Sequence, residues 1–213
     1  MKVGILGSGM VGKELGKGFI KIGYQVLIGS RDTLKLQEWK DSNGKNASTG
    51  TFSDAALFGD IVVIATNWQG TENAIKMAGL EHFRNKIVID VTNPLKIEPG
   101  APPSFMSSVD HSGGGTIQGW LPGAYVVKAF NIISASTMCN PKMKEGTADL
   151  FIAGNNKESK ELVAGIAKQW GWEKVIDLGD ISNAFFLEAL AMIWINYAFK
   201  NNKWNHAFKL LLN

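Results

Sequence analysis

The sequence KVGILGSGMVGKELGKGFIKIG, residues 2–23, decides the fold. Its apolar run Lys2–Leu6 predicts a strand, and the helically spaced apolar residues of Val11–Ile22 predict a helix. Between them lies Gly7-Ser8-Gly9-Met10-Val11-Gly12, a G-x-G-x-x-G match that alone would also fit a glycine-rich turn without a ligand. Here the first glycine allows a tight turn, the second lets the backbone approach a pyrophosphate, and the third lets helix and strand pack closely. We predict a dinucleotide-binding turn, with phosphates at the helix N-terminus.

Short apolar and longer amphipathic segments alternate along the rest of the chain and predict an α/β fold. Several are unbroken Val and Ile runs, which are typical of strands covered on both faces. The further strands expected are Tyr24–Ile28, Ile61–Ala65, Lys86–Val91, Tyr125–Lys128, Asp149–Ala153 and Lys174–Ile176. The further helices expected are Thr33–Lys40, Ser53–Phe58, Gln69–Ala78, Ser134–Met138, Lys157–Gln169 and one from Ser182 onward. We predict a Rossmann-type doubly wound, mainly parallel sheet over residues 1–179 and a small C-terminal helical subdomain over residues 180–213.

Composition narrows the classes of function. The 213 residues suffice for one ordinary domain, and 22 Lys and Arg against 19 Asp and Glu give a net charge of +3. Because the basic residues are scattered lysines, with Arg31 and Arg84 the only arginines, we expect no nucleic-acid partner. One cysteine, Cys139, excludes an intramolecular disulfide, and with three histidines it leaves no Cys-rich zinc site, so no metal centre is expected.

Charge placement bears on location and partners. Charged residues recur at short intervals in Met1–Gly29, which argues against an export signal and predicts a cytoplasmic protein. The most apolar stretch, Asn183–Phe199, contains Glu188 and falls short of the roughly 20 apolar residues of a membrane span. We therefore expect a buried or interface helix and no membrane partner. The residues expected to cover the sheet edge and to contribute to a homodimer contact are Phe185, Phe186, Leu190, Ile193, Trp194 and Tyr197.

The end of the second strand distinguishes NADP from NAD. An NAD site places an acidic residue on the ribose hydroxyl about 20 residues beyond the glycines, whereas an NADP site offers Arg to the 2′-phosphate. Here Ser30 and Arg31 end the strand and Lys35 lies one turn on. Asp32 is the competing acidic residue, but one position later it fits the N-cap of the following helix better. We predict NADP, because the guanidinium fork matches a phosphate.

Proline and glycine gather in Leu95–Gly123, which predicts a long irregular loop: Pro99, Pro102, Pro103, Pro122 and Gly113-Gly114-Gly115. The loop follows an expected central strand and so leaves the carboxyl edge of the sheet, where ligands bind in open α/β folds. It would contact substrate, with a mobile surface excursion as the alternative. His111 within it is a candidate for a catalytic proton donor, the alternative being a solvated loop histidine.

Five blocks of sequence carry a family resemblance: GILGSGMVGKELG (residues 4–16), IGSRD (28–32), VIDVTNPL (88–95), LPGAYVVKAFN (121–131) and LGDISNAFFLEALA (178–191). With them the chain resembles the coenzyme F420-dependent NADP oxidoreductases over nearly its whole length. It is also similar to the cytosolic domain of the six-transmembrane metalloreductases. The resemblance implies hydride transfer between NADPH and a second flat redox ring, either a deazaflavin (coenzyme F420) or a flavin.

The resemblance also implies where the cofactor contacts lie. The pyrophosphate contacts would be Ser8, Met10 and Val11, and the 2′-phosphate contacts Ser30, Arg31 and Lys35. The residues that would follow the cofactor toward the nicotinamide are Ala65, Thr66, Asn67, Trp68, Asn93 and Pro94. Those that would flank the nicotinamide itself are Ala129, Phe130 and Asn131.

The sequence shows no paired carboxylates and no Ser-His-Asp arrangement. Ring-to-ring hydride transfer does not need them, because it requires close approach of the two rings and the reactivity belongs to the cofactors. Lys128, at a strand end, is open to either a ligand contact or a structural ion pair. Two other functions stay open. One is a reductase of small carbonyl or imine compounds, which would need a proton donor and a larger helical domain than Asp180–Asn213; the other is an NADP-binding sensor without catalysis.

Overall fold

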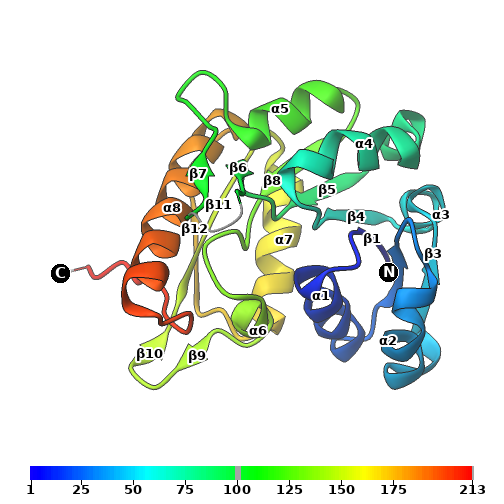
Figure 1. Cartoon of the computed structure of the whole chain (residues 1–213), viewed down its shortest axis with the longest axis horizontal. Coiled ribbons are helices and arrows are strands. Elements are labelled where there is room, and N and C mark those ends of the chain that lie inside the picture. Colours follow the sequence, from blue (N-terminus) through cyan, green and yellow to red (C-terminus); the bar gives the residue numbers. More distant parts are fainter. Residues whose placement is uncertain (99–101, 213) are drawn as a thin grey trace.

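Eight strands form one sheet in the order β12-β11-β8-β5-β4-β1-β2-β3 (Figure 1). The computed structural model describes residues 1–98 and 102–212. The strands are β1 (Lys2–Leu6), β2 (Gln25–Gly29), β3 (Ala47–Gly50), β4 (Ile61–Ile64), β5 (Ile87–Asp90), β8 (Tyr125–Lys128), β11 (Asp149–Gly154) and β12 (Lys174–Asp177). β11 is antiparallel to β8, and every other neighbouring pair in this sheet is parallel. The predicted mainly parallel Rossmann-type sheet is confirmed.

The register of the central strands positions the site. Ile5 of β1 lies opposite Ile28 of β2 on one side and Val63 of β4 on the other. Val63 in turn lies opposite Ile89 of β5. All four side chains are buried. Because the strands are parallel and in register, the turns that follow β1, β2, β4 and β5 meet at one edge of the sheet.

Helices cover both faces of the sheet, and each face has its own apolar core. The helices of one face are α1 (Met10–Lys21), α2 (Gln37–Ser42), α6 (Ala135–Met138) and α7 (Lys157–Gln169). Those of the other face are α3 (Phe52–Phe58), α4 (Trp68–Ala78), α5 (Gly113–Trp120) and the start of α8 (Ala184–Asn201). Figure 1 shows α8 along one side of the molecule, with α1 and α2 toward the other.

The strands and helices expected from the apolar pattern are present, and except for the last helix their ends are shifted by a few residues at most. β3 was not predicted, because its sequence Ala-Ser-Thr-Gly is a short polar edge strand without an apolar run. Short antiparallel pairs and 3-10 turns were also not predicted. The pairs are β6 (Leu95–Lys96) with β7 (Ser104–Phe105) and β9 (Lys142–Met143) with β10 (Gly146–Thr147). The 3-10 turns are η1 (Leu34–Leu36), η2 (Gly44–Asn46), η3 (Leu80–Phe83) and η4 (Ile181–Asn183).

The prediction of one long irregular loop over Leu95–Gly123 was wrong. Within the described part, the hairpin β6–β7 and helix α5 occupy this segment, while Pro99 lies outside the described residues. The glycines belong to the first turn of α5 because the helix approaches α8 closely: a Cβ on Gly114 would lie 2.6 Å from that of Ala184. Ser112 caps the helix, since its Oγ accepts from the Gly115 N–H at 3.0 Å. Close packing and a cap outweigh the low helix propensity of glycine.

The last helix is shorter than predicted, because α8 ends where Asn202 adopts a left-handed backbone with φ of 49°. The tail beyond it returns to β11, where the Asp149 N–H donates to the Phe208 carbonyl at 3.1 Å.

Among the described residues, one segment, Ile181–Asn201, is long and apolar enough to cross a membrane by length and composition, and 44% of its most apolar 18-residue stretch is buried. In the structure, α8 packs its inner face against α5 and β11.

Candidate cofactor site

The turn after β1 has the geometry that its three glycines predict. Gly7 has φ of +130°, and a Cβ there would lie 2.3 Å from the Ala65 carbonyl oxygen. A Cβ on Gly12 would lie 2.1 Å from the Gly7 carbonyl oxygen, so α1 starts tightly against the turn. A Cβ on Gly9, by contrast, would meet no heavy atom within 4 Å. Packing thus requires Gly7 and Gly12, whereas Gly9 leaves open space at the N-terminus of α1.

A cleft of about 450 Å³ opens beside this turn. Its lining residues are Gly7, Ser8, Gly9, Ser30, Arg31, Asp32, Lys35, Phe52, Ala65, Thr66, Asn67, Gln69, Gly70, Asn73 and Ala74. Ser30 is nearly buried and donates its hydroxyl to Ser8 Oγ at 3.1 Å, which ties the end of β2 to the glycine turn. Arg31 takes part in none of the ion pairs among the described residues, and its side chain is exposed at the cleft.

Asp32 is not the N-cap that the sequence predicts, because the following element is the 3-10 turn η1 and its N-cap is Thr33; Asp32 instead holds this turn through an i→i+2 side-chain contact. Its Oδ1 accepts from the Leu34 N–H at 3.1 Å, and its Oδ2 lies 3.5 Å from Lys35 Nζ. The Asp32 N–H donates to Ser30 Oγ at 3.1 Å. Asp32 is therefore engaged by its own segment while still lining the cleft.

A second cavity of about 400 Å³ continues from the first across Gly9, Ala65, Thr66 and Asn67, which line both. Its remaining lining residues are Met10, Val11, Trp68, Val91, Thr92, Asn93, Leu95 and Ile97. Among the described residues that line this cavity, none has a titratable side chain. The two cavities form one path from Arg31 to Asn93 along the carboxyl edge of the sheet.

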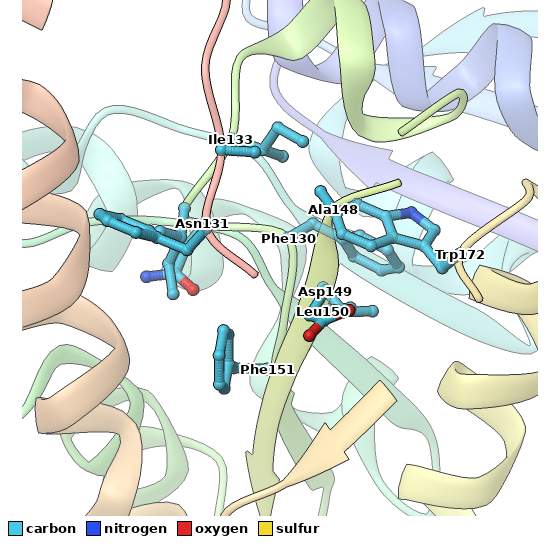
Figure 2. Close-up of a pocket in the computed structure, with 11 residues that line it drawn as sticks. Phe130, Asn131, Ile133, Ala148, Asp149, Leu150, Phe151 and Trp172 are labelled. Atoms are coloured by element: carbon cyan, nitrogen blue, oxygen red, sulfur yellow. The ribbon is translucent and has the colours of Figure 1, made fainter. Parts of the chain in front are cut away.

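Four of the residues predicted at the nicotinamide end lie elsewhere. Pro94 lines neither cavity. Ala129 and Phe130 are buried in the core, and Phe130 packs against Trp170 at a centroid distance of 5.2 Å. Figure 2 shows Phe130 and Asn131 at a different pocket, whose volume of about 10 Å³ is enough for no more than one water. Asn131 reaches the site only through Asn93: its Nδ2 donates to Asn93 Oδ1 at 2.9 Å, and Asn93 Nδ2 donates to the Asn131 carbonyl at 2.8 Å.

His111 does not join the described cavities either. Its backbone forms an isolated antiparallel bridge with Ser108, and its side chain is exposed. The structure therefore places this candidate proton donor in a surface turn, as the alternative interpretation expects.

A buried ionic cluster lies directly behind the second cavity. Lys128 Nζ is 2.9 Å from Asp90 Oδ2 and 2.8 Å from Glu188 Oε1, and all three side chains are completely buried. Lys128 also donates to the Thr92 carbonyl at 2.7 Å. Asp90 Oδ1 accepts from the Thr92 N–H at 2.9 Å and from its hydroxyl at 2.7 Å. Lys128 thus makes structural ion pairs, and we call Asp90, Lys128 and Glu188 the ionic cluster.

Glu188 connects the ionic cluster to α5. Its Oε2 accepts from Ser107 Oγ and from the Gly113 N–H at 2.9 Å, and its Oε1 accepts from the Gly114 N–H at 2.9 Å. Burial alone would raise the pKa of this carboxyl, but Lys128 and the hydrogen bonds outweigh burial and lower it. Burial likewise opposes the charged form of Lys128, and the two carboxylates outweigh it and raise the pKa of the ammonium. The contacts between Lys128 and Glu188 thus favour the ionised state of both groups.

Sequence reasoning missed the ionic cluster and several lining residues. The unpredicted lining residues are Asp32, Phe52, Gln69, Gly70, Asn73, Ala74, Val91 and Thr92, while Leu95 and Ile97 belong to the segment that the sequence predicts at the ligand edge of the sheet. A signal for the cluster does exist: Asp90, Lys128 and Glu188 each lie in an otherwise apolar run. A charge in a buried segment needs a partner, but sequence does not say which one.

Comparison with known proteins agrees with this geometry. The family model described as NADP oxidoreductase, coenzyme F420-dependent, matches residues 2–94. A crystal structure from Arthrobacter sp. FB24, provisionally named an F420-dependent NADP reductase, superposes with a TM-score of 0.94 at 33% identity, covering 100% of both chains. The chain belongs to the F420-dependent NADP oxidoreductase family. It is thus an NADP-dependent oxidoreductase by family, as predicted.

Two relatives differ in how much of their length this chain covers. The F420-dependent NADP reductase of Methanocaldococcus jannaschii is 29% identical over 217 residues, covering 94% of this chain and 95% of that protein. Metalloreductase STEAP3 of Rattus norvegicus is 28% identical over 195 residues, covering 90% of this chain but 36% of that protein. The chain therefore spans about a third of the length of the metalloreductases it matches, and nearly all of the F420-dependent reductase.

Proposed function

We propose that this chain transfers hydride between NADPH and a flat redox ring, either a deazaflavin such as coenzyme F420 or a flavin. The observation that carries the proposal is the path from Arg31 to Asn93. It starts at exposed cationic side chains and ends in a cavity with no titratable side chain among its described lining residues. Hydride transfer between stacked rings requires approach to about 3–3.5 Å and no side-chain acid or base.

The residues of the path fit NADPH from end to end. Arg31, with Lys35 nearby, would hold the 2′-phosphate, because a guanidinium binds phosphate through two parallel hydrogen bonds. Ser30 would support this end by tying it to Ser8. The open space at Gly9 and the N-terminus of α1 would take the pyrophosphate. NADPH, when bound, supplies the hydride from its nicotinamide ring.

The chain's own contribution at the inner end is orientation and exclusion of water. Met10, Trp68, Leu95 and Ile97 give the second cavity apolar walls, and Asn93 supplies a polar amide. Trp68 stacks on Trp120 with ring centroids 5.9 Å apart and an angle of 19° between the planes, which fixes its orientation. Such a surface suits a planar acceptor ring. The observed walls also support a ring over a small carbonyl or imine, which would need a positioned proton donor.

A panel of acceptors tests this function. NADPH oxidation would be followed with a deazaflavin, riboflavin, FMN, ferric complexes and small carbonyl and imine compounds. We expect turnover with the ring acceptors only, and faster turnover with NADPH than with NADH. Reduction of a carbonyl or imine without any ring substrate would overturn the proposal. Tight NADPH binding without turnover of any acceptor would favour a sensor.

We also propose that the protein forms a homodimer through the outer face of α8. Phe186, Ile193 and Tyr197 are 56%, 59% and 48% exposed and recur at helical spacing. Trp194, in contrast, is buried, and its indole N–H donates to the His206 carbonyl at 2.8 Å, so it belongs to the interior. Light scattering at micromolar concentration should give twice the mass of one chain, and Ile193→Glu should reduce it to one chain. A monomeric wild-type protein would exclude this contact.

A further inference from the structure

We infer that the buried ionic cluster positions the wall of the nicotinamide end, and that Glu188 on α8 is its key positioning residue. The inference rests on the proposed function, since it concerns the same cavity, and extends it to residues that line neither cavity. None of the three side chains touches the path from Arg31 to Asn93. Their effect would pass through the segments they hold.

The cluster holds the segment that follows β5. Lys128 and Asp90 together bind the N–H, the hydroxyl and the carbonyl of Thr92, so this residue cannot rotate without losing three hydrogen bonds. Thr92 and the next residue, Asn93, both line the second cavity. One wall of the cavity is therefore fixed by ions that lie behind it.

A second wall is held through α5. Glu188 accepts the Gly113 N–H, and a Cβ on Gly113 would lie 3.2 Å from the Trp68 ring and 3.2 Å from Pro94. The first turn of α5 is thus wedged between Glu188 and Trp68, the aromatic residue of the cavity. A shift of this turn would therefore change the position of the Trp68 ring.

A second chain of hydrogen bonds leads from Leu187, the residue before Glu188, to Asn93 in the cavity wall. The carbonyl of Leu187 accepts from Asn131 Nδ2 at 3.1 Å, and Asn131 exchanges hydrogen bonds with Asn93. Two consecutive residues of α8 therefore lead to two consecutive residues of the cavity wall, Thr92 and Asn93. Besides covering the sheet edge, α8 therefore helps to position Thr92 and Asn93.

Only a carboxylate satisfies the contacts at position 188. Each oxygen of Glu188 accepts one backbone N–H, from Gly113 or Gly114, and one oxygen also meets Lys128. Glu188→Gln has the same shape but turns an NH₂ group toward one of these N–H donors, whichever way the amide is placed. The substitution should loosen the first turn of α5 without creating a cavity.

The experiment compares the two ends of the path in one protein. Binding of 2′,5′-ADP reports the end at Arg31, and the additional affinity for NADPH reports the nicotinamide end. For Glu188→Gln we expect 2′,5′-ADP affinity within about two-fold of wild type and NADPH affinity about ten-fold weaker, the scale of a lost charge-assisted hydrogen bond. Ile195→Ala, a buried α8 residue outside the cluster, is the matched control and should lower the melting temperature while changing neither affinity.

Ser107→Ala provides a second variant if Glu188→Gln does not fold. It removes one hydrogen bond to Glu188 Oε2 and should weaken NADPH, but not 2′,5′-ADP, by about two- to five-fold. If the affinities for both ligands fell equally, or if neither fell, the inference would be overturned. The same holds if the wild-type protein bound NADPH no more tightly than 2′,5′-ADP. Wild type that binds NADPH but reduces no ring acceptor would refute the proposed function alone, because the binding comparison needs no acceptor.

Discussion

The two ends of the cofactor path are built in opposite ways. The end at Arg31 takes its glycine turn and its charged side chains from residues 7–35, which are close together in sequence, and these charges are exposed. The end at Asn93 is backed by Asp90, Lys128 and Glu188, which are far apart in sequence and completely buried. Exposed charges can bind a ligand at little cost to the fold, whereas buried charges must be paired. The exposed charges at the first end are thus available to bind a ligand, whereas the buried charges at the second end stabilise the cavity wall.

Lys128→Met should produce the largest effect, because it leaves two carboxylates buried side by side without their cation. We expect the free energy of unfolding to fall by about 3–5 kcal/mol, measured by urea denaturation. The control Lys76→Met removes an exposed i,i+4 pair with Glu72 and should cost no more than about 0.5 kcal/mol. Equal losses in the two variants would remove the contrast between buried and exposed charge.

Arg31→Ala should act on the ligand and leave stability unchanged. We expect NADPH binding to weaken by about 1.5–3 kcal/mol, the scale of a charged hydrogen bond, with little change for NADH. Calorimetric titration measures both, and Arg84→Ala, the only other arginine, is the control. If NADH binding weakened as much as NADPH binding, Arg31 would not be at the 2′-phosphate.

Two glycines of the turn after β1 show the same contrast, because Gly12 is needed for packing and Gly9 faces open space. Gly12→Ala should lower the free energy of unfolding by about 1–3 kcal/mol, because the new methyl group overlaps the Gly7 carbonyl. Gly9→Ala should leave the free energy of unfolding unchanged, since its methyl group enters open space, and should weaken NADPH binding. Thermal melts with and without NADPH measure both. Unchanged NADPH affinity in Gly9→Ala would argue against a pyrophosphate there.

The smallest expected effect concerns pH. The pKa of Glu188 is lowered from 4.5, so its contribution to stability is complete above 4.5 and is lost as pH falls through the lower folded value. The pKa of Lys128 is raised from 10.5, so its contribution is complete below 10.5 and is lost as pH rises through the higher folded value. The stability difference between wild type and Glu188→Gln should thus be constant between about pH 5 and pH 10. A steep change inside this window, measured by denaturation at several pH values, would contradict ionised partners.

Sequence reasoning succeeded where a local pattern has a local cause. The apolar runs predicted the strands of the sheet except β3, and the glycine spacing predicted the turn after β1. It failed for Gly113-Gly114-Gly115, because glycine normally marks a loop, and the close approach of Ala184 together with the Ser112 cap explains the helix there. It also placed Ala129 and Phe130 at the nicotinamide, whereas the chain after β8 enters the core.

The sequence by itself determined the Rossmann-type fold, the glycine turn and the cationic residues that follow β2, since each depends on residues within about one strand-helix-strand unit. The tertiary structure alone decided which side chains complete the inner cavity and that Asp90, Lys128 and Glu188 meet. Pairing of buried charges depends on where distant segments pack, and sheet order brings β5, β8 and α8 together without leaving a spacing rule in the sequence. Three isolated charges in apolar runs thus become one cluster only when the chain is folded.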